Sequence, residues 1–329
     1  MSFNNEKLWD ALNQVKMYFL MMWDVISTKY KDTLHIYKKA GIFHEPTTPP
    51  SVFSYVNNVK ILSFNIDDIA YHRHYYTNKD EARAIEIINY IDSTHSDVIC
   101  LQEVWSETMK QELMDAFTAK NYYVALPPWE KKYFVGENSG LMMISKYPII
   151  SQTFLKFGNN TFGCSFTNKG VQYCHLRIPN EDPETSTDLY LANAHLQASF
   201  TYISSFLDFS KRAESQLDSI IKNCPYESSL LVGDMNMNKK QMDAFIENRG
   251  DIYYFGEHQG DTFVGDNSRL DYFLKIVKNK KNMHYNMLKN AKNSVENNIA
   301  LSDHYPILSE FEFKNIDNSN LHSPTRASP

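Results

Sequence analysis

The stretch SSLLVGDMNMNKK at 228–240 places Asp234 and Asn236 at the end of an apolar run. Residues two apart in an extended segment project to the same side, so both side chains can address one phosphate group or one attacking water. The simpler explanation is that Gly-Asp and Met-Asn end a strand and form a turn. A functional site would need further reactive groups at the ends of other strands.

Several other predicted strands do carry acidic, amide or imidazole side chains at one end. They are Asn65 in LSFN, Glu103 in ICLQE, His195 in LYLANAH, Asp271 in RLDYFL, and Asp303 with His304 in LSDHYPIL. Each alone is more often structural, as a cap, a hydrogen-bonded core histidine or a turn former. Because strand ends and the loops after them are where rigid folds place their sites, the whole set predicts a functional site.

The chemistry of this set is coherent. Carboxylate and amide oxygens such as those of Glu103 and Asn65 suit Mg²⁺, with Mn²⁺ as an alternative. His304 supplies a base near neutral pH. Adjacent residues of an extended segment point to opposite sides, so Asp303 is better placed to serve a metal or another histidine than its own neighbour. The combination predicts metal-assisted cleavage of a phosphate ester.

Mixed helix-like and strand-like segments must position these residues. Strands are predicted at 59–66, 97–104, 140–145, 151–157, 171–177, 187–194, 229–233, 270–276 and 307–313. Helices are predicted at 79–92, 106–117 and about 206–222. Many strands with interspersed helices favour an α+β fold, a four-layer α/β/β/α sandwich of two packed mixed β-sheets flanked by helices.

The chain is expected to have three parts. Residues 1–50 are predicted to form an N-terminal helical extension that runs to about Tyr37 and a Pro-rich connector around HEPTTPPSV. An apolar stripe from Leu8 to Ile26 at helical spacing supports the helix, which either packs on the main domain or binds a membrane or a partner. Residues 51–314 are predicted to form the catalytic domain, and the polar tail 315–329 is predicted to be disordered.

Bulk composition narrows the class of protein. With 43% hydrophobic residues, the chain can bury a substantial core. The net charge of −6 disfavours a protein that grips the nucleic-acid backbone over a wide surface. The four cysteines lack the spacing of a zinc site and indicate a reducing compartment. No signal peptide is visible and the apolar stretch at 17–23 is too short to span a bilayer, so we expect a cytoplasmic protein.

The quoted motifs together resemble a known family. The set SFN, LQEVW, NAHLQA, GDMNMNK, RLDY and SDHYP is similar to the endonuclease/exonuclease/phosphatase superfamily, which has the deoxyribonuclease I-like fold, over roughly Val59 to Phe313. Within that superfamily the chain most resembles the neutral, Mg²⁺-dependent sphingomyelinases. The segments EVWSE, NSGLMMISKYPI and FTNKGV carry this finer resemblance, and the last two discriminate best against the nucleases.

The resemblance implies roles for the metal-binding and proton-transfer residues. Glu103 is expected to be the principal Mg²⁺ ligand, helped by Asn65. His304 is expected to be the general base that takes a proton from the attacking water. Asp234 and Asn236 are expected to position that water and the phosphate.

The resemblance also implies roles for residues around this centre. His195 is expected to stabilise charge on the non-bridging phosphate oxygens, and Asp271 to orient His195 and favour its charged form. Asp303 is expected at a second metal position or beside a histidine. Lys169 in NKG is a candidate for the substrate rim, although a turn lysine before a glycine is equally consistent. Asn138 stands where some bacterial relatives have an acid, and is a second candidate for substrate binding.

The expected reaction is hydrolysis of sphingomyelin, or a related choline phospholipid, to ceramide and phosphocholine by in-line attack of a metal- and His-activated water. This implies a phospholipid substrate at a membrane surface, peripheral membrane contact and no obligate protein partner. One alternative is a nuclease of the same superfamily, although NAHLQA stands where abasic-site endonucleases usually have a Tyr-x-Pro-Asn segment. The other is a non-catalytic scaffold that binds a membrane or a partner, which is disfavoured because every catalytic residue type is present.

Overall fold

The structure is a computed structural model. It describes residues 35–37, 42–46, 58–68, 80–128, 138–158, 160, 164, 167–180, 185–198, 209–257, 260–278, 288–296 and 301–313. The predicted N-terminal helix at 1–34 and the predicted disordered tail at 315–329 lie outside these residues.

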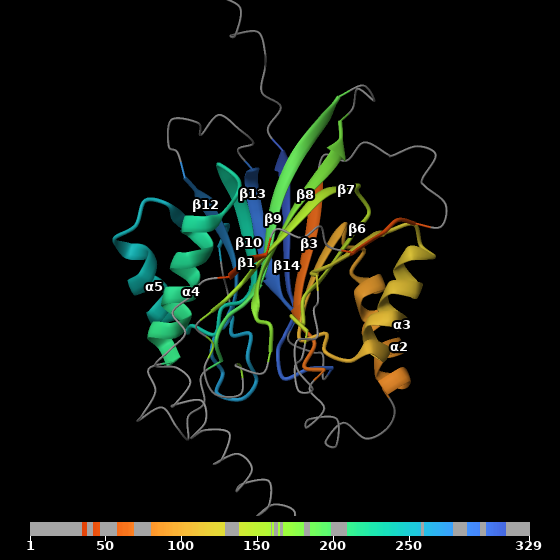
Figure 1. Ribbon diagram of the computed structural model, residues 1–329, viewed down its shortest axis with the longest axis horizontal. Coiled ribbons are helices and arrows are strands. Elements are labelled where there is room, and N and C mark those ends of the chain that lie inside the picture. Colours follow the sequence, from red (N-terminus) through yellow and green to blue (C-terminus); the bar gives the residue numbers. More distant parts are fainter. Residues whose placement is uncertain are drawn as a thin grey trace, which may run out of the picture.

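Two β-sheets pack face to face at the centre of the molecule (Figure 1). The first sheet has the strand order β1 (His35–Tyr37), β7 (Ile149–Lys156), β8 (Gly170–Pro179), β9 (Ser186–His195), β10 (Ser228–Asp234), β12 (Asp271–Val277) and β11 (Ile252–Tyr254). The second has the order β13 (Leu288–Val295), β14 (Ile307–Phe313), β3 (Asn58–Asn65), β4 (Val98–Gln102), β6 (Met142–Ser145), β5 (Tyr123–Leu126) and β2 (Ile42–His44). Both sheets are mixed.

Helices cover the outer faces of both sheets. In Figure 1, α4 (Phe209–Asn223) and α5 (Lys239–Glu247) lie outside the first sheet, and α2 (Asp80–Ser93) and α3 (Glu107–Thr118) lie outside the second. The buried residues of α4 recur at helical spacing, as Phe209, Ala213 and Leu217 illustrate. The predicted four-layer α/β/β/α sandwich is thereby confirmed.

The strand directions bring several chain segments to one end of the sandwich. β9 runs parallel to β10, and β3 runs parallel to β4. β12 is antiparallel to β10, with Asp271 opposite Asp234, and β14 is antiparallel to β3. The last residues of β3, β4, β9 and β10 therefore lie at the same end as the first residues of β12 and β14.

A polar contact ties the two sheets together inside the largely apolar core. The side chain of Gln102 donates a hydrogen bond to Asn193 Oδ1 over 2.8 Å, and Asn193 Nδ2 donates to the carbonyl of Leu101 over 3.0 Å. Buried amides keep such bonds because an unpaired one is costly in a low-dielectric interior. Since these residues lie near the ends of β4 and β9, their hydrogen bonds fix the end of β4 relative to the end of β9.

Some elements differ from the sequence-based expectation. His35–Tyr37 form an edge strand of the first sheet, not the end of a helix, and Ile42–His44 form an edge strand of the second. The strands β5, β11 and β13 and the helix α5 were not predicted. β13 reads LKNAKNSV, a polar edge strand without the apolar alternation that marks a half-buried one.

Within the described part of the chain, no helix combines the length and apolar character needed to cross a membrane. The four cysteines are all buried and free.

Candidate active site

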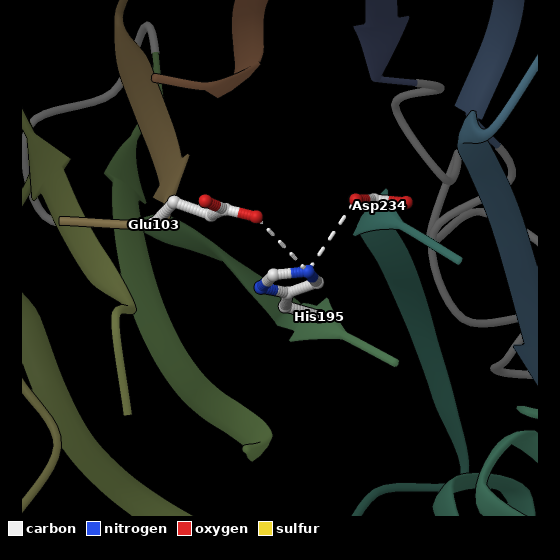
Figure 2. A group of neighbouring side chains, drawn as sticks. All are labelled: Glu103, His195 and Asp234. Carbon is white, nitrogen blue, oxygen red and sulfur yellow. Dashed lines mark ion pairs between the residues drawn. The ribbon is translucent and has the colours of Figure 1, made fainter. Parts of the chain in front are cut away.

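Three ionisable side chains from both sheets converge at the end where these strands meet (Figure 2). Glu103 follows β4, His195 ends β9 and Asp234 ends β10. The Nε2 atom of His195 lies 3.6 Å from Glu103 Oε1 and 3.4 Å from Asp234 Oδ2. These three residues are far apart in the sequence and lie together in the structure.

Unusual backbone geometry delivers these side chains. Glu103 and Asn236 have φ angles of 59° and 48°, in the left-handed region that non-glycine residues seldom adopt. Strain of this kind is typical of functional sites. Gly233 allows β9 and β10 to approach closely, because a Cβ atom there would lie 2.1 Å from the carbonyl oxygen of Ala194. That approach sits directly beside His195 and Asp234.

Asp234 accepts hydrogen bonds from several residues of the site. Its Oδ1 accepts a hydrogen bond from the backbone of Asn236 over 2.8 Å, and its Oδ2 accepts from the amide groups of Asn65 (3.1 Å) and Asn236 (3.2 Å). Asn65 also donates to Glu103 Oε1 over 3.3 Å. The Oδ1 atom of Asn65 accepts from the backbone N–H of Asp67. Asn65 thus holds the two carboxylates through its amide nitrogen, and its role as a metal ligand stays a prediction.

His195 is neutral and is paired with a buried lysine. Lys169 Nζ lies 2.6 Å from His195 Nε2 and 2.7 Å from the carbonyl oxygen of Leu196. Burial, together with the nearby positive charges of Lys169 and His304, holds the pKa of His195 well below its usual value. Its contacts with Glu103 and Asp234 are ion pairs only when the ring is protonated. The low pKa disfavours the charged form expected for His195, and that charge stays a prediction.

His304 has the opposite environment. Its Nδ1 atom donates to Asp271 Oδ2 over 2.8 Å, and its Nε2 atom lies 3.8 Å from Asp234 Oδ2. Burial alone would lower the pKa of His304, but the surrounding carboxylates of Asp271, Asp234 and Asp303 raise it to about 10. Asp271 was expected to orient His195. It contacts His304 instead, because β12 lies on the side of β10 away from β9.

The two carboxylates at the centre of the site have raised pKa values. Burial is the largest cause for both, and it raises the pKa of Asp234 to about 6. For Glu103, the positive charges of Lys169 and His304 oppose the effect of burial. Negative charge in this site is therefore costly, and a cation between the carboxylates would relieve it.

The remaining predicted residues lie less centrally or are already engaged. Lys169 is 3% exposed and contacts His195, so it is not on a rim. Asn138 uses both ends of its amide on local backbone, at Trp105 O and Gly140 N, and offers little to a substrate. Asp303 is not among the three grouped ligand residues, and within the described residues its carboxylate bonds to the neighbouring Ser302 at 3.4 Å. A metal-binding role for Asp303 stays a prediction.

Sequence reasoning missed two residues that shape the site. Trp105 donates to Glu103 Oε2 over 3.4 Å, and its ring centroid lies 6.4 Å from that of His195. Gly140, at φ 68°, leaves room for this indole, because a Cβ atom there would lie 2.7 Å from it. Thr262 Oγ1 accepts from the backbone N–H groups of Leu270 and Asp271. Trp105 stood in the quoted EVWSE motif, whereas Thr262 carried no sequence signal.

The donor set suits a divalent cation. One ligand atom from each of Glu103, His195 and Asp234 lies within 4.8 Å of the other two. The carboxylates are the residues that would hold the ion, because His195 Nε2 is engaged by Lys169. The partly buried carboxylate of Glu103 and the buried one of Asp234, both bonded to the amide of Asn65, provide the hard oxygen ligands that Mg²⁺ or Mn²⁺ prefers.

Sequence comparison places this geometry in a known group of proteins. The profile of the Endonuclease/Exonuclease/phosphatase family matches residues 62–304. A sphingomyelinase of Dictyostelium discoideum is 28% identical over 112 residues, and an uncharacterized protein of the same organism is 30% identical over 178 residues. These matches span 24% and 14% of the length of the two relatives.

Solved structures share the fold at low identity. A beta toxin variant from Staphylococcus aureus with bound magnesium ions has a TM-score of 0.58 and 20% identity, and the match covers 77% of this chain and 99% of that one. Sphingomyelinase C from Streptomyces griseocarneus has a TM-score of 0.57 and 18% identity, and the match covers 78% of this chain and 99% of that one. The D. rerio TDP2 complex with a single-strand DNA product has a TM-score of 0.56 and 14% identity, and the match covers 78% of this chain and 100% of that one.

Proposed function

Because the chain belongs to the endonuclease/exonuclease/phosphatase family, we propose that it is a Mg²⁺-dependent phosphodiesterase. Its proposed substrate is sphingomyelin, or a related choline phospholipid, which it hydrolyses to ceramide and phosphocholine. The observation that carries the reaction class is the position of Asp234, which lies between the Glu103–His195–Lys169 group and the His304–Asp271 pair. The likeness to sphingomyelinases in sequence and in the FTNKGV and NSGLMMISKYPI segments favours the lipid substrate.

His304 is the proposed proton-transfer group. Asp271 holds the proton on Nδ1, which leaves Nε2 facing Asp234 and the space where a phosphodiester and its attacking water would lie. Mg²⁺ held by Glu103 and Asp234 would polarise the phosphoryl oxygens and, by adding positive charge, bring the pKa of His304 down from about 10 towards neutrality. In that state Nε2 can accept a proton from water.

The other side of the site stabilises charge. Lys169 is a buried amine that donates to neutral His195, beside two carboxylates. We propose that Lys169, with His195, faces the negative charge that builds up on the phosphoryl oxygens. Donors aimed at such charge in a water-poor site are among the largest catalytic contributions. Asn236 and Asn65 both donate to Asp234 Oδ2 and so fix that carboxylate.

The test compares a lipid with a nucleic acid. Purified full-length protein is incubated with Mg²⁺ and either sphingomyelin vesicles, supercoiled plasmid or single-stranded DNA, and His304→Ala serves as the control. We expect phosphocholine release that is lost in the variant and after chelation with EDTA, and that returns when Mg²⁺ is added. DNA cleavage without lipid cleavage would overturn the lipid substrate in favour of the nuclease. If the unmodified protein cleaved none of the three substrates, the non-catalytic scaffold would be favoured.

We also propose that the enzyme meets its substrate at a membrane surface from the cytoplasm, without an obligate protein partner. The support is chemical, since a phospholipid substrate resides in a bilayer. Vesicle sedimentation with the full chain and with residues 1–34 deleted would test this. Unchanged vesicle binding with a lower melting temperature would mean that the N-terminal segment packs on the domain rather than on lipid.

A further inference from the structure

A small cavity borders Asp271, the residue whose carboxylate orients His304. Its volume is about 10 Å³, and the residues that line it include Thr262, Asp271, Asn293 and Val295. This is close to the smallest volume that holds one water molecule, which also needs two to four polar partners. The cavity is therefore large enough for one water and too small for another ligand.

Asn293 lines this cavity and carries a buried acceptor without a partner among the described residues. Its Nδ2 atom donates to the carbonyl of Phe255 over 2.7 Å, which fixes the orientation of the amide. The Oδ1 atom is then buried and has no hydrogen-bond partner among the described residues. Buried amide oxygens are rarely left unpaired, because the lost hydration is not replaced.

Thr262 presents a donor. Its Oγ1 atom already accepts two backbone N–H groups, at 2.9 Å from Leu270 and 3.0 Å from Asp271. Within the described part of the chain its hydroxyl hydrogen has no acceptor. Asp271 presents a second acceptor, because among the described residues its carboxylate is bonded through Oδ2 to His304. One donor and two acceptors around one water-sized cavity match the hydrogen-bonding capacity of water.

We propose that this cavity holds one ordered water, which accepts from Thr262 and donates to Asn293 Oδ1 and Asp271 Oδ1. Thr262 and Asn293 are then positioning residues. Together with the water they fix the carboxylate that fixes His304. The functional part of this proposal rests on the proposed role of His304 in phosphodiester hydrolysis.

A crystal structure of the full chain tests the water itself. We expect a well-ordered water within about 2.6–3.2 Å of Thr262 Oγ1, Asn293 Oδ1 and Asp271 Oδ1. Clear density without a water at this position would overturn the proposal, whether or not the protein hydrolyses any substrate. A chain without phosphodiesterase activity would refute the proposed function separately, and the density would still decide this point.

Two substitutions test the positioning role. Val295→Ile adds a methylene to the cavity wall and displaces the water without touching a polar group, and Asn293→Leu removes its acceptor. We expect each to lower kcat about tenfold with little change in KM, because His304 acts on the reaction and not on substrate binding. Asn293→Ser, which restores a hydroxyl, should recover part of the loss.

Ser309→Ala is the matched control. Ser309 lies opposite Asn293 in the β13–β14 register and is equally without a hydrogen-bond partner at its buried Oγ among the described residues, but it does not line the cavity. It should change the melting temperature at most. A similar loss of kcat in Ser309→Ala and Asn293→Leu, or no loss in Val295→Ile with the water displaced, would overturn the positioning role.

Discussion

Each sheet contributes one buried histidine to the site, and the pKa values of the two rings are shifted in opposite directions. His195 ends β9 of the first sheet and is 1% exposed, and His304 precedes β14 of the second and is 5% exposed. Burial lowers the pKa of both rings. Lys169 adds to that effect at His195, whereas carboxylates reverse it at His304. Because burial acts in the same direction on both rings, the charged neighbours account for the difference between them.

The largest effect should come from removing the ring that carries the proton. His304→Ala is expected to lower kcat by about 10²–10⁴-fold, the usual contribution of a positioned acid or base. His195→Ala should cost less, because a neutral ring that accepts from Lys169 transfers no proton. Steady-state kinetics with circular dichroism would show activity lost from a folded protein. Equal losses in both variants would remove the functional difference between the two histidines.

Removal of the lysine should have the next largest effect. Lys169→Met keeps most of the side-chain volume but leaves His195 without its donor and removes one of the two positive charges near the carboxylates. We expect kcat to fall by about 10²–10³-fold, as when one donor to a developing oxyanion is lost. Lys278→Met, far from the site at the end of β12, is a matched control. If Lys169→Met kept full activity, the lysine would be a structural group only.

The hydrogen bond between His304 and Asp271 gives Asp271 and Asp303 different expected roles, which the sequence alone does not distinguish. Asp271→Asn should lower kcat by about 10–10²-fold, the usual cost of losing a group that orients an active-site ligand. Asp303→Asn should cost less, because among the described residues the carboxylate bonded to the His304 ring is that of Asp271, whereas Asp303 accepts from Ser302. The measurement is kcat for both variants at one saturating Mg²⁺ concentration. A larger loss for Asp303→Asn would instead support its predicted metal-binding role.

The smallest expected effect concerns the pH dependence of stability. The pKa of His304 is about 10 in the fold and about 6.5 in an unfolded chain. Its stabilising contribution is therefore complete below about pH 6.5 and is lost as the pH rises towards 10. The pKa of His195 is shifted down, so its contribution opposes folding only as the pH falls below about 6.5.

Urea unfolding at pH 7 and pH 9.5 would measure this difference. The gap in unfolding free energy between the unmodified protein and His304→Gln should narrow at the higher pH. The corresponding gap for His195→Gln should stay constant over the same range. Parallel behaviour of the two variants would show that the neighbours do not set the charge states as described.

Much of the fold could be predicted because its strands are buried and apolar. VKILSFN, DVICLQE and SSLLVGD carry continuous apolar runs, and they end in Asn65, Glu103 and Asp234, which lie together in the structure. The edge strands β2 and β13 could not be predicted, because short or polar strands owe their pairing to a neighbour and not to their own pattern.

The candidate residues themselves were available from the sequence, but their partners were not. Asp271 could be recognised as a site residue, yet the histidine it serves depends on which strand lies beside β10. From the sequence, Lys169 was a candidate for the substrate rim or a turn lysine, and its burial against His195 requires β8 and β9 to pair.

The sequence alone determined the residue types and their places at strand ends. Those residues, oxygen ligands and two imidazoles, predicted the kind of chemistry, which is the cleavage of a phosphate ester. Strand order and register decided which charges face which ring. A pKa responds to charges within a few ångströms in a medium of low dielectric constant, and those distances exist only after the two sheets have packed. The charge states of His195 and His304 are therefore properties of the tertiary structure.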